Sequence, residues 1–260
     1  MRSYEPSFWF PAAARPETGP LTAGWNTVVP QMKAWELLGA TSAPDGTDIR
    51  LTRRDDEYVI LANGKPLMSS RLHGSEEALA TLGCAEARAQ AHPRVLVGGL
   101  GMGFTLRAVL DVLPFAASVF VAELVPAVIE WNRGPLGALA GHPLRDPRVR
   151  IAVADVGFTL RESHGRFDAI LLDVDNGPAA FTAAVNAGLY DNSGVAAAYA
   201  ALCPGGTLAI WSAWEDRKFE QRLRFYGFTV EVVRVRARLK KGGPRHTIFL
   251  AHKRRSGSGT

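Results

Sequence analysis

The sequence predicts an α/β fold in which a small β-rich region precedes a seven-stranded, mostly parallel sheet that ends in an antiparallel hairpin. Two observations predict this fold. From residue 94 onward, apolar runs of strand length alternate with helical stretches, which is typical of a parallel sheet covered on both faces. Residues 228–239 then alternate apolar and polar side chains and are followed by Gly-Gly-Pro and a second apolar run, which predicts the hairpin.

The chain divides by composition into four expected segments. These are an irregular arm at 1–25, a small β-rich region at 26–75, a nucleotide-binding catalytic domain at 76–253 and a disordered tail at 254–260. Within the β-rich region, Asn63 and Gly64 form a pair that favours a tight hairpin turn. Residues 75–82 predict the first helix, with Ser75 as its N-cap.

The elements of the main domain follow in regular order. The expected strands are 94–99, 118–124, 148–154, 167–174, 205–213, 228–239 and 246–253. The expected helices between them are 104–113, 126–134, 157–163, 195–202 and 215–227. A parallel sheet of this order that closes with a hairpin has the pattern of a Rossmann-like, class I methyltransferase fold.

Composition excludes several classes of protein. Hydrophobic residues make up 47% and charged residues 21% of the chain, as in an ordinary soluble protein. No apolar run reaches the ~18–20 residues that span a bilayer, and we expect no secretory leader at the N-terminus. Cys84 and Cys203 lie far apart and have no metal-ligand spacing, so we expect no metal site and a reducing, cytoplasmic environment.

The net charge of +5 raises the question of an acidic partner. Much of the excess lies near the C-terminus, in Arg234, Arg236, Arg238, Lys240, Lys241, Arg245, Lys253, Arg254 and Arg255. This charge is typical either of a solvated strand face and tail or of a patch that attracts an acidic partner. We favour the solvated face and expect no nucleic-acid partner, because no aromatic-rich RNA-binding motif accompanies the charge.

A glycine-rich loop gives the clearest sign of a ligand site. Gly99, Gly101, Met102 and Gly103 follow a buried strand and precede a helix, so backbone and helix N–H groups can approach a ligand closely. The dinucleotide fingerprint needs Gly or Ala three residues after its second glycine. Phe104 occupies that position, so the NAD(P) fingerprint fails.

Two further strand ends carry acids that suit a nucleoside. Glu123 and Leu124 end the second strand, where an acid can accept hydrogen bonds from ribose hydroxyls; the alternative is a surface or capping glutamate. Asp155 and Val156 follow the third strand. Asp155 suits an adenine amino group with Val156 against the ring, and it equally suits an N-cap of the next helix.

The fourth strand ends in two carboxylates. Asp173 and Asp175 lie two residues apart, directly beyond a buried strand. Acids in this place can orient an attacking amine or take its proton, and a shared pocket raises one pKa. The alternative for Asp175 is a turn, because Asp-Asn-Gly-Pro has turn composition. His73, Tyr190 and Trp211 are candidate substrate residues, and each also suits a structural role.

In this order the segments resemble the spermidine synthase family, within the class I S-adenosylmethionine-dependent methyltransferase superfamily. The resemblance covers residues 58–213 and rests on NGKPLMSSRLHGSEEAL, VLVGGLGMGFTLR, VAELV, DPRVRIAVADVGFTL and FDAILLDVDNGP. It implies binding of S-adenosylmethionine or its decarboxylated form, and it makes Asp173 the counterpart of the catalytic aspartate. The family commonly forms dimers or tetramers, so a homodimer is also a hypothesis for this chain.

Three departures from the family pattern bear on the reaction. The glycine loop has Met102 where aminopropyltransferases have an aspartate, the segment 70–76 lacks their tyrosine, and their second acid falls nearest Asn176, with Asp175 beside it. From these departures we expect methyl transfer from S-adenosylmethionine to a small-molecule acceptor. The alternatives are a polyamine aminopropyltransferase that uses decarboxylated S-adenosylmethionine, and a non-catalytic nucleotide-binding or interaction protein.

Overall fold

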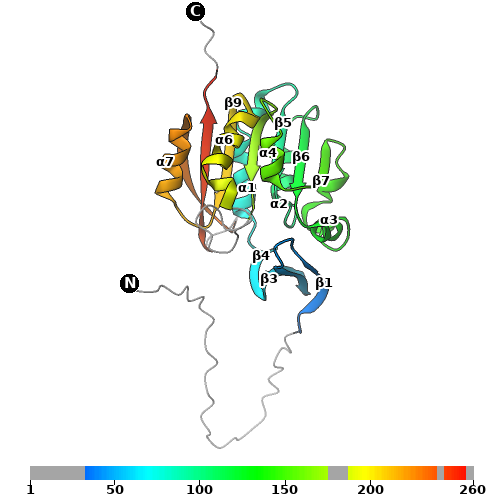
Figure 1. The fold of residues 1–260 in the computed structure, drawn as a ribbon. Coiled ribbons are helices and arrows are strands. Elements are labelled where there is room, and N and C mark those ends of the chain that lie inside the picture. The colour runs from blue at the N-terminus through cyan, green and yellow to red at the C-terminus, as the bar shows by residue number, and fades with distance from the viewer. Residues whose placement is uncertain (1–32, 175–186, 239–242, 256–260) are drawn as a thin grey trace, which may run out of the picture. The chain divides into compact units, whose positions relative to one another are not determined.

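A mixed sheet organises the main part of the chain, as predicted. The computed structural model describes residues 33–174, 187–238 and 243–255, and within them this sheet has seven strands (Figure 1). The strands are β5 (Arg94–Gly98), β6 (Ser118–Glu123), β7 (Val149–Val153), β8 (Phe167–Leu172), β9 (Leu202–Ser212), β10 (Phe228–Arg236) and β11 (Arg245–Lys253). Their order across the sheet is β10-β11-β9-β8-β5-β6-β7.

The strand order fixes where a ligand would bind. Strand β11 runs antiparallel to both of its neighbours, and the other neighbouring pairs are parallel. The predicted hairpin is confirmed, since β10 and β11 pair from Phe228 with Lys253 to Arg236 with Arg245. Strand β5 lies between β6 and β8, so the order of strands reverses direction there. In open α/β sheets, ligands bind beyond the carboxyl ends of the strands at such a switch point.

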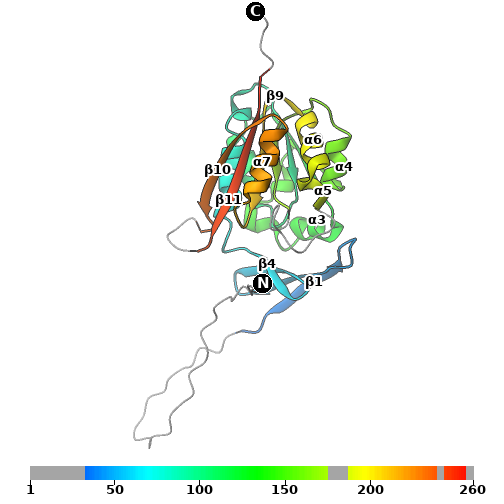
Figure 2. The same ribbon diagram turned by 60° about the vertical axis from the view of Figure 1, so that its left-hand side comes forward.

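Helices cover both faces of this sheet (Figures 1 and 2). One face packs against α1 (Gly74–Gly83), α2 (Phe104–Val112) and α3 (Pro126–Arg133). The other packs against α4 (Val156–Arg161), α5 (Ala187–Tyr190), α6 (Asn192–Ala201) and α7 (Arg217–Phe225). Short 3-10 turns lie at Ala87–Ala89, Gly137–Ala140 and Pro143–Arg145. Within the described part of the chain, every helix is too short or too polar to span a membrane.

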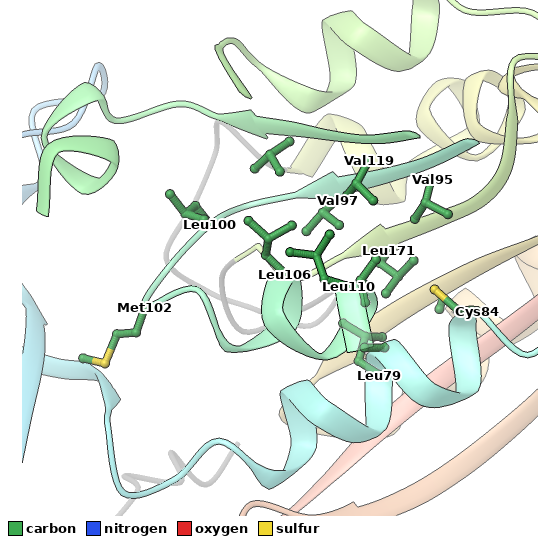
Figure 3. Packing of buried hydrophobic residues seen from close by; sticks show 14 of the residues in the cluster. Leu79, Cys84, Val95, Val97, Leu100, Met102, Leu106, Leu110, Val119 and Leu171 are labelled. Carbon is green, nitrogen blue, oxygen red and sulfur yellow. The ribbon is translucent and has the colours of Figure 1, made fainter. Parts of the chain in front are cut away.

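The strands are buried on both faces, and successive side chains enter different clusters. Val95 and Val97 of β5 pack with Leu79 of α1 and Leu106 of α2, whereas Leu96 belongs to the cluster on the other face (Figure 3). Burial of each such leucine or valine side chain stabilises the fold by about 1.5–3 kcal/mol. This two-sided burial explains why the sequence shows continuous apolar runs in these strands.

The predicted β-rich region forms an antiparallel sheet. Its strands are β1 (Glu36–Ser42), β2 (Asp48–Arg54), β3 (Glu57–Ala62) and β4 (Lys65–Ser69), in that order across the sheet. The predicted hairpin turn is confirmed: Asn63 has φ 48° and Gly64 has φ 74° between β3 and β4. Left-handed values at both central residues are those of a type I′ turn. Ile49, Leu51 and Ile60 of this sheet join the buried cluster that contains α1 and α2.

The start of α1 differs from the prediction. His73 occupies the N-cap position and makes no capping hydrogen bond with its side chain, and Ser75 lies inside the first turn. The prediction of Ser75 as the N-cap was therefore wrong. The physical reason is that the Ser75 hydroxyl bonds to the side chain of Glu76 instead of a backbone N–H group. The proposed boundary between residues 75 and 76 falls within this turn, and the division into domains stays a prediction.

Candidate active site

The glycine loop between β5 and α2 passes close to the end of β8. Gly99 has φ 86°, and a Cβ atom there would lie 2.4 Å from the carbonyl oxygen of Asp173. Gly101 has φ 50°, and a Cβ atom there would lie 2.8 Å from Cε of Met68 in β4. Only glycine accepts such a backbone conformation together with such close neighbours. The loop therefore brings the end of β8 and the N-terminal sheet together at one edge of the main sheet.

Met102 lies in this loop, but its side chain faces the interior. It is 1% exposed and belongs to the apolar cluster that also contains Leu100 and Leu106 (Figure 3). The sequence placed Met102 among the cofactor-binding residues. In this structure the whole residue is enclosed by protein, so the thioether is not available to a ligand. Gly103 follows with φ 84° and precedes the first residue of α2.

Glu123, the last residue of β6, holds the glycine loop in place. Its Oε2 accepts a hydrogen bond from the Leu100 backbone N–H at 2.8 Å, and its Oε1 accepts one from the Val125 N–H at 2.8 Å. Burial raises the pKa of Glu123. Hydrogen bonds from backbone N–H groups to its carboxylate, including that of Leu124, oppose this rise. The carboxylate thus ties the end of β6 to the loop, and its ribose contact stays a prediction.

Asp155 caps α4. Its Oδ1 accepts a hydrogen bond from the Phe158 backbone N–H at 2.6 Å, so the predicted N-cap is present. Val156 is buried beside Gly98, where an added Cβ atom would lie 2.7 Å from Val156 Cγ2. Val153 and Phe158, on either side of Asp155 in sequence, are more than half exposed. Contact of Asp155 and Val156 with an adenine stays a prediction.

Asp173, directly after β8, is the acid that the sequence placed at the centre of the site. The Thr105 hydroxyl, in the first turn of α2, donates a hydrogen bond to Asp173 Oδ2 at 2.5 Å. The Asp173 backbone N–H bonds to the Gly98 carbonyl, which continues the pairing with β5. Burial raises the pKa of Asp173 to about 6, and the Thr105 hydroxyl opposes this rise. Asp175 lies outside the described residues.

A second buried carboxyl, Glu76, was not predicted. It lies in the first turn of α1, is 7% exposed, and accepts a hydrogen bond at Oε2 from the Ser75 hydroxyl at 2.7 Å. Burial and the charge of Asp173 raise its pKa to about 8. Nothing in the sequence distinguishes Glu76 from its half-exposed neighbour Glu77. Thr105 did offer a signal, because a hydroxyl just past the glycine loop lies at the same edge as the acid after β8.

The three candidate substrate residues have different surroundings. His73 stacks on Phe104 with ring centroids 4.2 Å apart. Trp211, near the end of β9, meets the ring of His246 edge-on, and its Nε1 is buried without a hydrogen-bond partner among the described residues. Tyr190 packs in the cluster on the other face, and its hydroxyl lies 3.2 Å from the Val174 carbonyl oxygen. Tyr190 therefore supports the backbone just after Asp173.

Part of the C-terminal basic charge is paired. Arg234 of β10 forms an ion pair with Glu215, and both side chains are exposed. Lys253 of β11 donates hydrogen bonds to the backbone carbonyls of Tyr199 and Leu202 at 2.7 Å. These two cations are therefore engaged within the chain, which favours the solvated-face interpretation.

Solved structures of spermidine synthases have a fold similar to that of this chain. The spermidine synthase of Thermotoga maritima superposes with a TM-score of 0.65 and 21% identity, over 84% of this chain and 72% of that chain. A spermidine synthase in complex with the transition-state analogue AdoDATO superposes with a TM-score of 0.63 and 20% identity, over 84% of this chain and 72% of that chain. This chain has a spermidine synthase-like fold.

A third structure agrees with this spermidine synthase-like fold. A probable spermidine synthase from Corynebacterium glutamicum ATCC 13032 gives a TM-score of 0.58 and 19% identity, over 83% of this chain and 79% of that chain. No model of a protein family matches the sequence, and no curated protein matches it significantly. The likeness therefore concerns the fold.

Proposed function

We propose that this protein is an aminopropyltransferase that transfers the aminopropyl group of decarboxylated S-adenosylmethionine to a primary amine. The observation that carries the proposal is Asp173: a carboxyl with a raised pKa at the switch point of a spermidine synthase-like fold, held by Thr105. The sequence alone favoured methyl transfer. The similar structures are spermidine synthases, so they support aminopropyl transfer and give methyl transfer no support.

The residues at this edge fit an adenosine-type ligand. Glu123 places a carboxylate at the end of β6, where ribose hydroxyls bind in related sheets. Val153 and Phe158 offer exposed apolar surface on either side of Asp155, which suits the faces of a purine ring. The interior position of Met102 leaves the loop without an acid. The positive charge of an aminopropyl group would therefore be met by Asp173.

Asp173 would act as the general base. When bound, decarboxylated S-adenosylmethionine supplies an aminopropyl carbon attached to a positively charged sulfur. The amine nitrogen forms a bond to that carbon, the C–S bond breaks with its electron pair going to sulfur, and methylthioadenosine leaves. The Asp173 carboxylate accepts a proton from the amine, and a base with a pKa near 6 is ionised at neutral pH. Thr105 keeps the carboxylate oriented.

Calorimetric titration of the full chain tests the proposal. The ligands are decarboxylated S-adenosylmethionine, methylthioadenosine, S-adenosylmethionine and S-adenosylhomocysteine. We expect the first two to bind more tightly, and we expect mass spectrometry to detect an aminopropylated product from 1,4-diaminobutane. Tighter binding of the last two would favour methyl transfer, and binding of none would refute both reactions. Asp173→Asn is the matched variant, which we expect to bind methylthioadenosine but to lose turnover by a factor of about 10²–10⁴.

A further inference from the structure

Glu76 is a buried carboxyl that the proposed reaction does not use. It lies in the first turn of α1, and that turn is at the loop end of the sheet. Figure 3 shows the direction of the helix: Cys84, just past the end of α1, lies near Val95 at the start of β5, and Leu79 lies farther toward the glycine loop. The N-terminal turn that carries Glu76 therefore extends toward the edge where Asp173 lies.

A chain of hydrogen bonds fixes the Glu76 carboxyl. The Ser75 hydroxyl has one hydrogen and donates it to Glu76 Oε2 at 2.7 Å. The Ser75 hydroxyl oxygen also lies 2.9 Å from Nδ1 of His246 in β11, so the imidazole hydrogen-bonds to the same hydroxyl. Burial lowers the pKa of His246, which keeps the ring neutral near pH 7. The chain thus orients Glu76 without placing a positive charge beside it.

The charges around Glu76 are mostly negative. Burial is the largest cause of the raised pKa of Glu76, and the charge of Asp173 is the second. Glu77 on the same helix adds a small rise. The Ser75 hydroxyl and the Glu76 backbone N–H lower the pKa. Glu77 is directed to His73, with Oε1 2.7 Å from Nδ1. Asp173 is in turn bonded to Thr105. With pKa values of about 8 for Glu76 and about 6 for Asp173, the pair carries one proton and one negative charge near pH 7.

We propose that Glu76 is a positioning residue that acts through Asp173: it carries the proton that leaves Asp173 ionised, and it releases that proton when a cationic amine binds beside the pair. The proposal rests on the proposed function, since it assumes a cationic amine as substrate. The proton balance is simple. The ammonium enters with its charge, the Glu76 carboxyl becomes a carboxylate, and one proton goes to solvent.

This arrangement serves the reaction in two ways. In the absence of substrate, neutral Glu76 avoids the repulsion between two buried carboxylates, so Asp173 remains ionised at neutral pH. When the amine is bound, ionised Glu76 adds a second negative charge to hold a positively charged substrate. Glutamine can replace the neutral form of Glu76 but cannot supply the second charge. The substitution Glu76→Gln therefore separates the two states.

Titration of the free protein tests the pair without any ligand. Carbon-13 NMR of the side-chain carboxyls should show one resonance with a midpoint near pH 8, and Glu76→Gln should remove it. Glu77→Gln is the matched control and should keep it, because Glu77 is the adjacent, half-exposed glutamate. Asp173→Asn should move the midpoint to lower pH, because the repulsion from Asp173 is gone. A midpoint near pH 8 that survives in Glu76→Gln, or that does not move in Asp173→Asn, overturns the proposal.

Proton release on binding is the second test. Calorimetric titration with 1,4-diaminobutane, in the presence of methylthioadenosine, is made at pH 7 in two buffers with different ionisation enthalpies. A group with a pKa one unit above the pH is about nine-tenths protonated, so the wild type should release about 0.9 proton and Glu76→Gln close to none. Equal release from both proteins overturns the proposal. If neither ligand binds but the NMR titration is as expected, the proposed function is contradicted, and with it the role of Glu76 in substrate binding. The shared titration of Glu76 and Asp173 in the free protein would still hold.

Discussion

Substitution of Glu76 by glutamine should remove a large part of the pH dependence of folding stability. The pKa of Glu76 is about 8 in the folded protein, against an ordinary value of 4.5. Between these two pH values the folded state binds more protons than the unfolded state, so the free energy of unfolding falls as pH rises. The contribution of Glu76 to stability is complete below pH 4.5 and is lost as pH rises through about 8. Glutamine has no proton to lose, so its contribution is constant.

The magnitude follows from the shift in pKa. A difference of 3.5 units between 8 and 4.5, at 1.36 kcal/mol for each unit, gives on the order of 5 kcal/mol. This is an upper limit, because Asp173 titrates in the same range and the two shifts are coupled. Against a typical domain stability of about 5–15 kcal/mol, a loss of even half this size is easily measured.

Urea denaturation at pH 5 and pH 9 is the assay. We expect wild type to lose several kcal/mol more than Glu76→Gln between the two pH values. Glu77→Gln, which removes the adjacent half-exposed carboxyl, should follow wild type. An equal loss in wild type and Glu76→Gln would show that Glu76 has an ordinary pKa, and the reasoning from burial would be refuted. This assay needs no ligand and is independent of any catalytic role.

Three other substitutions have definite expected outcomes. Met102→Asp should destabilise the fold by several kcal/mol in urea denaturation, because it buries a carboxyl in an apolar cluster; unchanged stability would show that the side chain is exposed. Thr105→Val should raise the pKa of Asp173 and shift the acidic limb of the rate–pH profile upward by about one unit, since it removes a hydrogen bond to the ionised form; an unmoved limb would contradict this. Asp155→Ala should lower thermal stability by about 1 kcal/mol through loss of the N-cap, with Asp155→Ser as the control that retains a cap.

The order of the elements could be predicted because each depends on local pattern. The parallel strand β8 is buried on both faces, so it appears as an apolar run, and the edge strand β10 has one more exposed face, so its side chains alternate. The Asn63-Gly64 turn needs left-handed backbone at two successive residues, and asparagine followed by glycine is the pair that favours this conformation. Each of these predictions rests on residues that are adjacent or nearly adjacent in the chain.

The start of α1 could not be predicted by the same reasoning. A serine before two glutamates and an apolar run has the pattern of an N-cap. In the fold, β11 brings His246 against Ser75, and Ser75 turns its hydroxyl to Glu76. His246 is 171 residues away from Ser75, so no local pattern reveals the contact. The burial of Glu76 depends on the same long-range packing.

Met102 shows a different limit of sequence reasoning. Its place in the glycine loop correctly indicated that it lies between β5 and α2, because the loop is fixed by the strand before it and the helix after it. The direction of its side chain depends on loop torsions and on the apolar neighbours that accept it. A residue of a ligand-binding loop can therefore belong to the core, and its identity then reports packing more than ligand preference.

The conformation of the glycine loop is set by the protein's own packing. Its positive φ angles and close approaches are required by contacts within the protein: the Asp173 carbonyl near Gly99, Met68 near Gly101, and the Glu123 carboxylate on the Leu100 N–H. A chain that had lost all activity would still need these glycines to fold. The glycines therefore identify the fold, and the chemistry depends on the acids that the loop brings to its edge.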